Sequence, residues 1–298
     1  MTFVLEAGGP LNADATLARY RIWGADPVNR LADGAFARVV RLGEALIPYE
    51  VRFSGPVDEA RLHVRVDADP SSAVRDVVSG EVRKLFGLDF DLPAFYRFAR
   101  GEPVLEQLIE PHYGLRPTLT PAPLEILVAS ITAQQINLSF AFACRARLVR
   151  GYGVPIAVGS GSVYAFPTAT VLSQVSVSDL RALKYSSRKA EYIRDLARTI
   201  ASEELDCEAL AVAPNAEVVA RLTALRGLGR WTAEWFLARG LGRGDVCPAG
   251  DLAVRKAFEH YFGNGAPLSE EEVRRRAEGW GPHQNLAVHY LLAAHRSS

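Results

Sequence analysis

The feature that most constrains the fold of this chain is a glycine-containing turn between two predicted helices. An amphipathic helix expected over 216–225 runs into Arg226-Gly-Leu-Gly229, and a second helix expected over 231–241 begins at once. Two glycines around one apolar residue permit a very tight turn, because glycine tolerates positive φ and close backbone approach. The turn leaves the first amides of the second helix unobstructed, and these N–H groups, together with the helix dipole, suit a phosphate group.

Phosphate binding by such a turn would hold a DNA backbone without reading its sequence. The alternative for a bare G-x-G between helices is a plain αα-hairpin, which occurs in many unrelated proteins. The longer string L-x-G-L-G-x-x-T-A over 225–233 is more specific, because each glycine has a fixed place relative to both helices. The amino-acid composition does not itself support DNA binding. The 34 Lys and Arg residues balance 34 Asp and Glu residues, whereas proteins that coat DNA are usually basic.

An aspartate downstream of the hairpin is the candidate catalytic residue. Asp251 ends the segment Cys247-Pro-Ala-Gly-Asp251 and directly precedes an apolar-periodic stretch, 252–262. A helix N-cap is therefore one interpretation of Asp251. A carboxylate at a helix start can also face a cleft, so the capping and catalytic interpretations are compatible.

Composition excludes several other classes of protein. The three cysteines are scattered singly, which argues against a disulfide framework, a zinc site or an iron–sulfur cluster. No stretch approaches the roughly 20 apolar residues of a membrane helix, and no secretory signal is visible at the N-terminus. A cytoplasmic protein without a membrane partner is expected.

Periodicity predicts an α+β fold. Segments 49–53 and 61–66 alternate apolar and polar residues as half-buried strands do, and a helix follows over about 70–85. After about residue 90 the pattern is helical almost to the end, apart from a Pro-rich connection over 114–123 and an expected glycine-rich loop over 151–161. Further helices are expected over 91–101, 104–109, 124–141 with an interruption near Gln134, 169–175, 178–183, 187–201, 252–262, 270–279 and 284–295.

The hairpin, the Gly/Pro-containing loop and Asp251 together resemble the helix-hairpin-helix–Gly/Pro-Asp superfamily of DNA glycosylases. Within it, the chain is most similar to the AlkA-type 3-methyladenine DNA glycosylase II, and segments 123–137 and 166–190 agree with that branch. The resemblance implies a TATA-binding-protein-like α+β module over 1–90. An all-α helix-hairpin-helix region over 91–298 would follow, with the active-site cleft between two helical subdomains.

The resemblance also implies an activity in base excision repair. Such an enzyme flips a damaged nucleotide out of duplex DNA and hydrolyses the N-glycosidic bond of alkylated purines such as 3-methyladenine and 7-methylguanine. Asp251 would stabilise the oxocarbenium-like sugar and help to orient or deprotonate water. The expected partner is double-stranded DNA with a damaged base, and the protein is expected to be a monomer associated with a prokaryotic nucleoid.

The other site residues follow from the same resemblance. Trp231 and Trp235 lie four apart, hence on one helix face, and are expected to line the base pocket, where a cationic alkylated purine would meet their rings. Gln134 is also placed in the pocket. Leu292 replaces an aromatic residue of the best-known AlkA-type pocket, which shifts or broadens the expected substrate range. The alternative for the two tryptophans is core packing.

Residues expected to contact DNA lie on two loops. Gln135 is the expected plug that fills the gap left by the flipped base. Gly227, Gly229, Arg230 and Thr232 are the expected contacts to the DNA backbone. No cofactor is expected to be required, although the resemblance implies a structural Na or K ion on backbone carbonyls, here those of Thr223, Leu225 and Leu228.

Lysine usage distinguishes two mechanisms. Bifunctional relatives, which form a Schiff base and cut the strand, carry a lysine at the position of Trp231. The lysines of this chain are Lys84, Lys184, Lys189 and Lys256, so hydrolysis without lyase activity is predicted. The remaining alternatives are a glycosylase for oxidised or deaminated purines and a catalytically silent helix-hairpin-helix DNA-binding protein.

Overall fold

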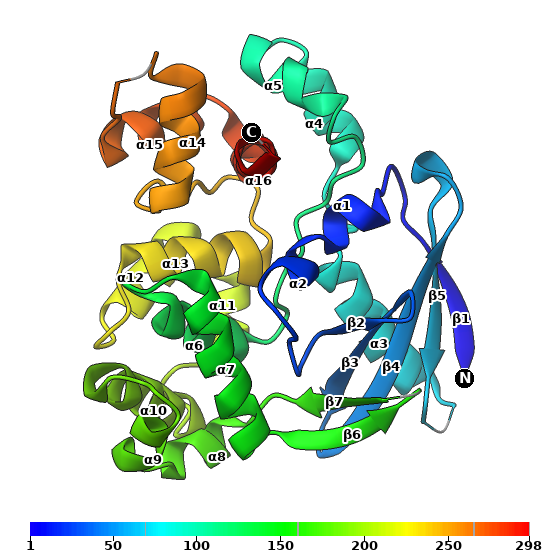
Figure 1. Cartoon of the computed structure of the whole chain (residues 1–298), viewed down its shortest axis with the longest axis vertical. Helices are drawn as coiled ribbons and strands as arrows, with labels where there is room; N and C mark the ends of the chain where they lie inside the picture. The colour runs from blue at the N-terminus through cyan, green and yellow to red at the C-terminus, as the bar shows by residue number, and fades with distance from the viewer. Residues whose placement is uncertain (69, 160, 265, 298) are drawn as a thin grey trace.

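The computed structural model describes all residues except 69, 160, 265 and 298, and its N-terminal part is a five-stranded antiparallel sheet (Figure 1). The strand order is β1-β5-β4-β3-β2. One face of the sheet is covered by helix α3 (Ser72–Leu85), which begins at the Ser71 N-cap and buries Val74, Val78 and Val82 against the strands. The strands are β1 (Thr2–Glu6), β2 (Arg30–Ala32), β3 (Ala35–Leu42), β4 (Ala45–Ser54) and β5 (Arg61–Val66).

The rest of the chain is mainly helical, which confirms the mixed α+β fold class. The expected helices 187–201 and 252–262 agree with the structure to the residue, and the expected interruption near Gln134 separates α6 from α7. No helix among the described residues is long and apolar enough to cross a membrane. The helices are α1 (Ala13–Leu17), α2 (Arg19–Ile22), α4 (Leu92–Ala99), α5 (Pro103–Ile109), α6 (Pro123–Ala133), α7 (Leu138–Tyr152), α8 (Ala169–Gln174), α9 (Val177–Ala182), α10 (Ser187–Ala201), α11 (Cys207–Val212), α12 (Asn215–Thr223), α13 (Arg230–Trp235), the π-helix η2 (Phe236–Leu241), α14 (Leu252–Phe262), α15 (Glu270–Glu278) and α16 (Gln284–Ser297), with short 3₁₀ turns η1 (Val57–Glu59) and η3 (Gly281–His283).

The expected glycine-rich loop over 151–161 is wrong. The chain forms an antiparallel hairpin there, β6 (Val154–Val158) and β7 (Gly161–Ala165), inside the region expected to be all-α. Val158, Val163 and Ala165 pack against the sheet. The flanking glycines hid a short period-2 alternation, and the apolar face of this alternation is buried by the distant strand β3 rather than by its own neighbours.

Buried side chains of the helical region form two clusters with a shared border. One cluster is built from α6 to η2, and the other combines α4 and α5 with α14, α15 and α16. Trp235 packs against both clusters. The hairpin helix α13 and the segment before α14 therefore meet where the two clusters face each other.

A buried ion-pair network joins the sheet to the helices. Arg38 on β3 donates to Glu125 Oε2 on α6 at 2.6 Å and to Glu81 on α3 at 2.8 Å. Arg145 on α7 donates to Glu125 Oε1 at 2.6 Å and to Asp26 Oδ1 at 2.7 Å. Because the Arg38 and Glu125 side chains are 3% and 2% exposed, either charge without its partners would be strongly destabilising.

We expect Glu125→Gln to lower the free energy of unfolding by about 3 kcal/mol or more, because it leaves two buried guanidinium groups undercompensated. Urea denaturation followed by circular dichroism measures the change. Glu271→Gln is the matched control, since the Arg275–Glu271 pair is 71% and 73% exposed and should contribute less than about 1 kcal/mol. Equal losses in the two variants would contradict a structural role for the network.

Candidate active site

The hairpin turn depends on two glycines for different reasons. Gly227 has φ +90°, and a Cβ there would lie 2.3 Å from the ring of Tyr192, so both conformation and space require glycine. Gly229 has an ordinary φ of −106° as the N-cap of α13, and a Cβ there would meet nothing within 4 Å. Gly229 therefore leaves an open outer face at the start of α13, as the sequence predicted.

Asp251 is the N-cap of α14 and also faces Trp231 and Trp235. Its Oδ1 accepts the backbone amides of Ala253 and Val254 at 2.8 and 3.2 Å. Its Oδ2 accepts the indole N–H groups of Trp231 at 2.8 Å and Trp235 at 3.1 Å. One carboxylate thus has four N–H donors, two that fix it to its own helix and two that come from α13.

These contacts add a hydrogen-bonding role to the two tryptophans. The i, i+4 spacing predicted that Trp231 and Trp235 share a face of α13, and both line a cavity of about 220 Å³ together with Asp251 and Leu292. The two indole N–H groups converge on a single oxygen. Sequence spacing gave no signal for this convergence, because it depends on how α14 meets α13.

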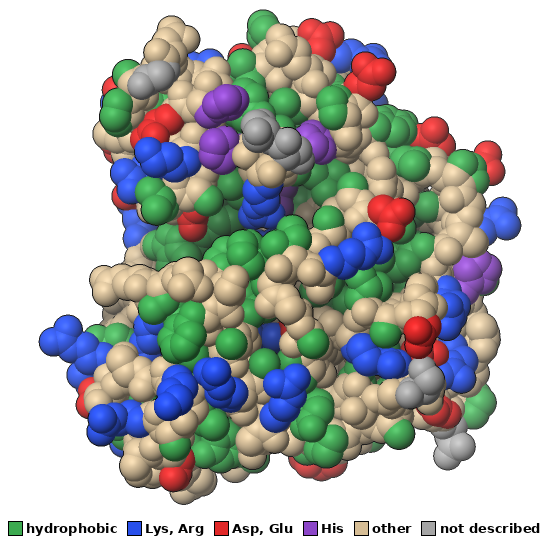
Figure 2. Space-filling model, in the orientation of Figure 1, with side chains coloured by type: hydrophobic (Ala, Val, Ile, Leu, Met, Phe, Trp, Pro, Cys, Tyr) green, Lys and Arg blue, Asp and Glu red, His purple; other side chains and the backbone are tan. Residues whose placement is uncertain are grey.

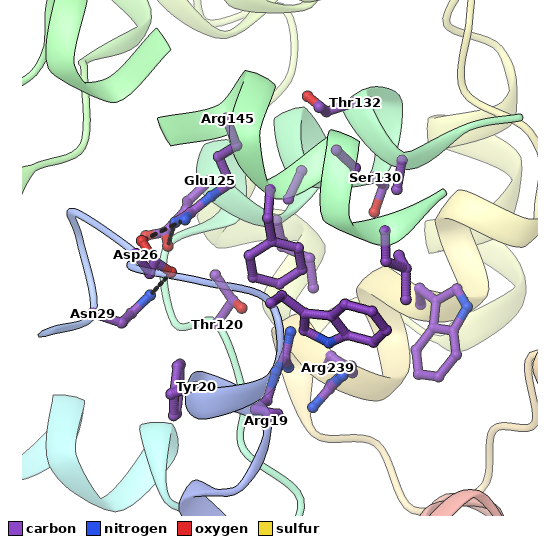
Figure 3. Close-up of a pocket in the computed structure, with 18 of the residues that line it drawn as sticks. Arg19, Tyr20, Asp26, Asn29, Thr120, Glu125, Ser130, Thr132, Arg145 and Arg239 are labelled. Atoms are coloured by element: carbon purple, nitrogen blue, oxygen red, sulfur yellow. Dashed lines mark hydrogen bonds and ion pairs between the residues drawn. The ribbon is translucent and has the colours of Figure 1, made fainter. Parts of the chain in front are cut away.

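Another wall of this cavity comes from parts of the chain that the sequence did not single out. Trp23, which follows α2, stacks on Phe142 of α7 with ring centroids 6.2 Å apart, and Tyr20 also lines the cavity. Asp26, Glu125 and Arg145 of the buried network lie at one side of it (Figure 3). No periodicity or motif in 19–26 indicated a pocket, so only the fold brings this wall to Asp251.

The two glutamines between α6 and α7 have different environments. Gln134 is not among the described residues that line the cavity, which corrects its expected place in the base pocket; its Nε2 instead donates to the carbonyl of Gly227 at 2.9 Å. Gln135 is exposed and adopts φ +53°, a conformation that is uncommon for a residue with a side chain. Gln134 therefore fixes the hairpin turn, while Gln135 projects from the loop.

The expected DNA contacts of α13 need one correction. Arg230 is 59% exposed and pairs with Glu234 at 2.9 Å. Thr232 is 1% exposed and its hydroxyl is buried, so its side chain lies in the core and cannot reach DNA. The helix turns Thr232 inward because Ala233 and Phe236 of the same segment are buried in the first cluster.

A basic surface accompanies the hollow seen in the space-filling view. Lys and Arg side chains gather over α7 to α10, below a hollow lined by hydrophobic side chains (Figure 2). The net charge of the whole chain is zero and therefore did not predict this surface. The exposed Lys and Arg residues of the segment 138–201, which holds α7 to α10, are Arg147, Arg150, Arg181, Lys184, Arg188 and Arg198.

Comparison with known proteins places these features in a family. The model of the HhH-GPD superfamily of base excision DNA repair proteins matches residues 128–283. A DNA-3-methyladenine glycosylase of Bacillus subtilis is 29% identical over 217 residues, covering 73% of this chain and 72% of the relative. DNA-3-methyladenine glycosylase 2 of Escherichia coli is 26% identical over 267 residues, covering 89% of this chain and 87% of the relative.

A solved structure agrees with the sequence relatives. The 3-methyladenine DNA-glycosylase from Archaeoglobus fulgidus superposes with a TM-score of 0.88 at 26% identity and covers 99% of this chain and 98% of that one. The AlkA-type resemblance seen in the hairpin and Asp251 is thereby confirmed. This chain belongs to the HhH-GPD superfamily of base excision DNA repair proteins.

Proposed function

We propose that this protein is a monofunctional DNA glycosylase that hydrolytically removes alkylated purines from duplex DNA and leaves an abasic site. The observation that carries the proposal is the Asp251 carboxylate, held by four N–H donors at an aromatic cavity. The names of the relatives, DNA-3-methyladenine glycosylases, support alkylated bases as the substrate class. We expect it to act as a monomer on nucleoid DNA in a prokaryotic cytoplasm.

Base flipping would bring the damaged nucleotide into the cavity. Turning a base out of the stack costs a few kcal/mol, and a side chain in the gap offsets part of that cost. Gln135 is suited to this role because it is exposed on the tight α6–α7 loop. The flipped base would then lie between the Trp23–Phe142 wall and the tryptophans of α13.

Hydrolysis would proceed by departure of the base from C1′ and capture of the sugar by water. Cleavage of the C1′–N bond leaves positive charge on the deoxyribose, and a nearby carboxylate stabilises that charge and accepts a proton from the attacking water. Asp251 would take this role. An N-alkylated purine carries positive charge before cleavage and departs neutral, so it needs little assistance from an acid.

The DNA backbone would be held by the open start of α13 and the basic surface. The amides after Gly229 lack helical partners and lie at the positive end of the helix dipole. We expect the implied monovalent cation at the carbonyls of Thr223, Leu225 and Leu228, because Thr223 ends α12, where free carbonyls and the negative helix end suit a cation. The Leu225 carbonyl also accepts the Leu228 amide at 3.1 Å. Such an ion would offset the charge of a DNA phosphate.

We expect Asp251→Asn to lower the rate of base release about 100-fold or more, because it removes the charge that stabilises the sugar cation. Asparagine is as good an N-cap as aspartate, so α14 should remain folded. Single-turnover release of 3-methyladenine and 7-methylguanine from methylated duplex DNA measures the effect.

Asp206→Asn is the matched control for that variant. Asp206 caps α11 with the same geometry, accepting two amides at 2.8 and 2.9 Å, but it does not line the cavity. It should leave base release unchanged. Full turnover by Asp251→Asn would remove Asp251 from the mechanism, and the silent DNA-binding alternative would gain support if neither variant nor the native protein released any base.

We expect Trp231→Phe to lower kcat about 10–100-fold while changing KM less, because it removes an N–H donor to a charged carboxylate but keeps an aromatic face. Trp23→Phe is the control: it makes the same change of ring in the cavity wall, where no indole contact to Asp251 is lost. Steady-state kinetics separates the two effects. Equal effects of both variants on kcat would show that Trp231 acts through its ring alone.

The expected absence of lyase activity rests on where the lysines lie relative to the cavity. None of the described residues that line the cavity is a lysine, and Lys189 is engaged by the carbonyl of Thr132 at 2.8 Å. We therefore expect borohydride to trap no covalent protein–DNA complex on damaged duplex DNA, because no amine is placed to form a Schiff base. A trapped band on a denaturing gel would reveal an amine nucleophile and refute the monofunctional assignment.

A further inference from the structure

A second cavity, of about 270 Å³, lies beside the candidate base pocket. It is enclosed by residues of α1 and α2, by the connection 112–118, and by η2 and α16. The described residues that line it include neither Asp251 nor the tryptophans of α13. The proposed hydrolysis therefore makes no use of the second cavity.

The lining of the second cavity is strongly basic. Among the residues that the structure describes, four arginines and two histidines line it, and no aspartate or glutamate does. Figure 3 shows two of the arginines, Arg19 and Arg239, next to each other although they are far apart in the sequence. A concave surface with charge of one sign concentrates counter-ions. The basic residues are Arg19, Arg116, Arg239, Arg296, His112 and His289.

Two of these arginines hold backbone carbonyls. Arg116 donates from Nε to the carbonyl of Pro10 and from a terminal nitrogen to that of Gly87, both at 2.8 Å. Arg239 donates to the carbonyl and hydroxyl of Thr118 at 3.1 and 3.2 Å. These acceptors are neutral, so they satisfy N–H groups but leave the positive charges unmatched.

The other two arginines have no such contacts. Arg19 lies over the ring of Tyr20 at 5.8 Å. Like the exposed Arg296, it forms no hydrogen bond or ion pair within the described part of the chain. Burial lowers the pKa of Arg19 and, more strongly, that of Arg239, yet arginine stays protonated in proteins. The cavity therefore keeps its positive charge.

The nearby carboxylates are committed elsewhere. Asp26 pairs with Arg145 at 2.7 Å. Asp251 accepts two backbone amides and two indole N–H groups. Both line the base pocket, and neither belongs to the lining of the second cavity. Since buried charge without a partner is costly, an anion from solution would stabilise this part of the fold.

His289 adds a hydrogen-bond acceptor to the lining. Its Nδ1 lies 2.8 Å from the Asn285 carbonyl, and because a carbonyl only accepts, Nδ1 carries the proton. Burial, together with the charge of Arg239, lowers the pKa of His289 to about 3, so the ring is neutral at pH 7. Its Nε2 is then an acceptor, and it has no hydrogen-bond partner among the described residues.

A hydrogenphosphate ion matches both kinds of group. Its anionic oxygens accept from guanidinium groups, which fit them in a bidentate fork, and its P–O–H group donates to Nε2 of His289. A sulfate ion and the phosphodiester of DNA carry no such proton. The volume also favours a compact ion: about 270 Å³ holds an ion with a few waters of about 30 Å³ each, whereas drug-sized ligands occupy pockets of about 300–1,000 Å³.

We propose that the second cavity is a binding site for inorganic hydrogenphosphate, whose oxygens accept from Arg19, Arg239 and Arg296 and whose proton is donated to His289. The site is separate from the proposed glycosylase function and does not depend on it. A bound ion would join α2, η2 and α16, the elements that carry these residues. Phosphate binding should therefore stabilise the folded protein.

Thermal unfolding at constant ionic strength tests the site. Replacing chloride by inorganic phosphate at about ten times the Kd should raise the Tm of the native protein by about 3 °C, and Arg19→Met should remove this rise. Arg21→Met is the matched control, because Arg21 lies on the same helix but is 51% exposed and pairs with Asp14; the rise should persist in it. An equal rise in Arg19→Met and the native protein would overturn the proposal.

A second variant supplies the missing negative charge from the chain itself. Ala18 lines the second cavity, so Ala18→Glu places a carboxylate beside the arginines. It should raise the Tm in chloride and abolish the effect of phosphate, and it keeps the site testable if Arg19→Met does not fold. A full phosphate effect in Ala18→Glu would contradict binding in this cavity.

Other anions test the role of the proton. Sulfate stabilises proteins non-specifically as phosphate does, and dimethyl phosphate mimics the DNA phosphodiester. Both should bind about tenfold more weakly than phosphate, because neither can donate to Nε2 of His289. Equal stabilisation by sulfate or dimethyl phosphate, or no rise of the Tm with phosphate in the native protein, would overturn the proposal. Since these measurements use no DNA, such a result would leave the glycosylase function intact.

Discussion

The site depends on one carboxylate that is held from two directions. Asp251 Oδ1 caps α14, which belongs to the second helical cluster, while Oδ2 accepts both indoles of α13, which belongs to the first. The same side chain therefore caps the start of α14, joins two packed cores and faces the cavity. Because backbone amides fix its orientation, the carboxylate would need no reorganisation to stabilise the sugar cation of the proposed reaction.

The cavity wall that contains Asp26, Glu125 and Arg145 is held by buried charge rather than by a helix cap. Glu125 and Arg145 line the cavity and belong to the network that ties β3 to α6, α7 and Asp26. Trp23 lies three residues before Asp26 and stacks on Phe142 of the helix that carries Arg145. Packing of the N-terminal sheet on the helices thus helps to hold this wall of the pocket in place.

Local signals predicted most of the elements and the catalytic candidate. The 3.6-residue periodicity placed α10 and α14 to the residue, and the glycines with Asp251 pointed to the hairpin and its carboxylate. The predictions were wrong where a contact with a segment distant in the sequence determines the local structure. The apolar face of the β6–β7 hairpin is buried by the distant strand β3. Thr232 turns inward because its helix packs in the first cluster. Gln134 donates a hydrogen bond to a carbonyl in the hairpin turn between α12 and α13. None of these partners is visible from the neighbouring sequence.

The net charge of the chain does not predict where charged groups gather, for the same reason. A total of zero conceals two separate arrangements: a buried network in which Arg38 and Arg145 are matched by carboxylates, and a basic surface over α7 to α10. An exposed charge acts over a short range, because salt screens it within about a Debye length, roughly 8–10 Å, whereas a buried charge is screened much less. Aromatic walls accept many flat bases, so a glycosylase with this cavity would have to discriminate among lesions through the polar and charged groups of its lining.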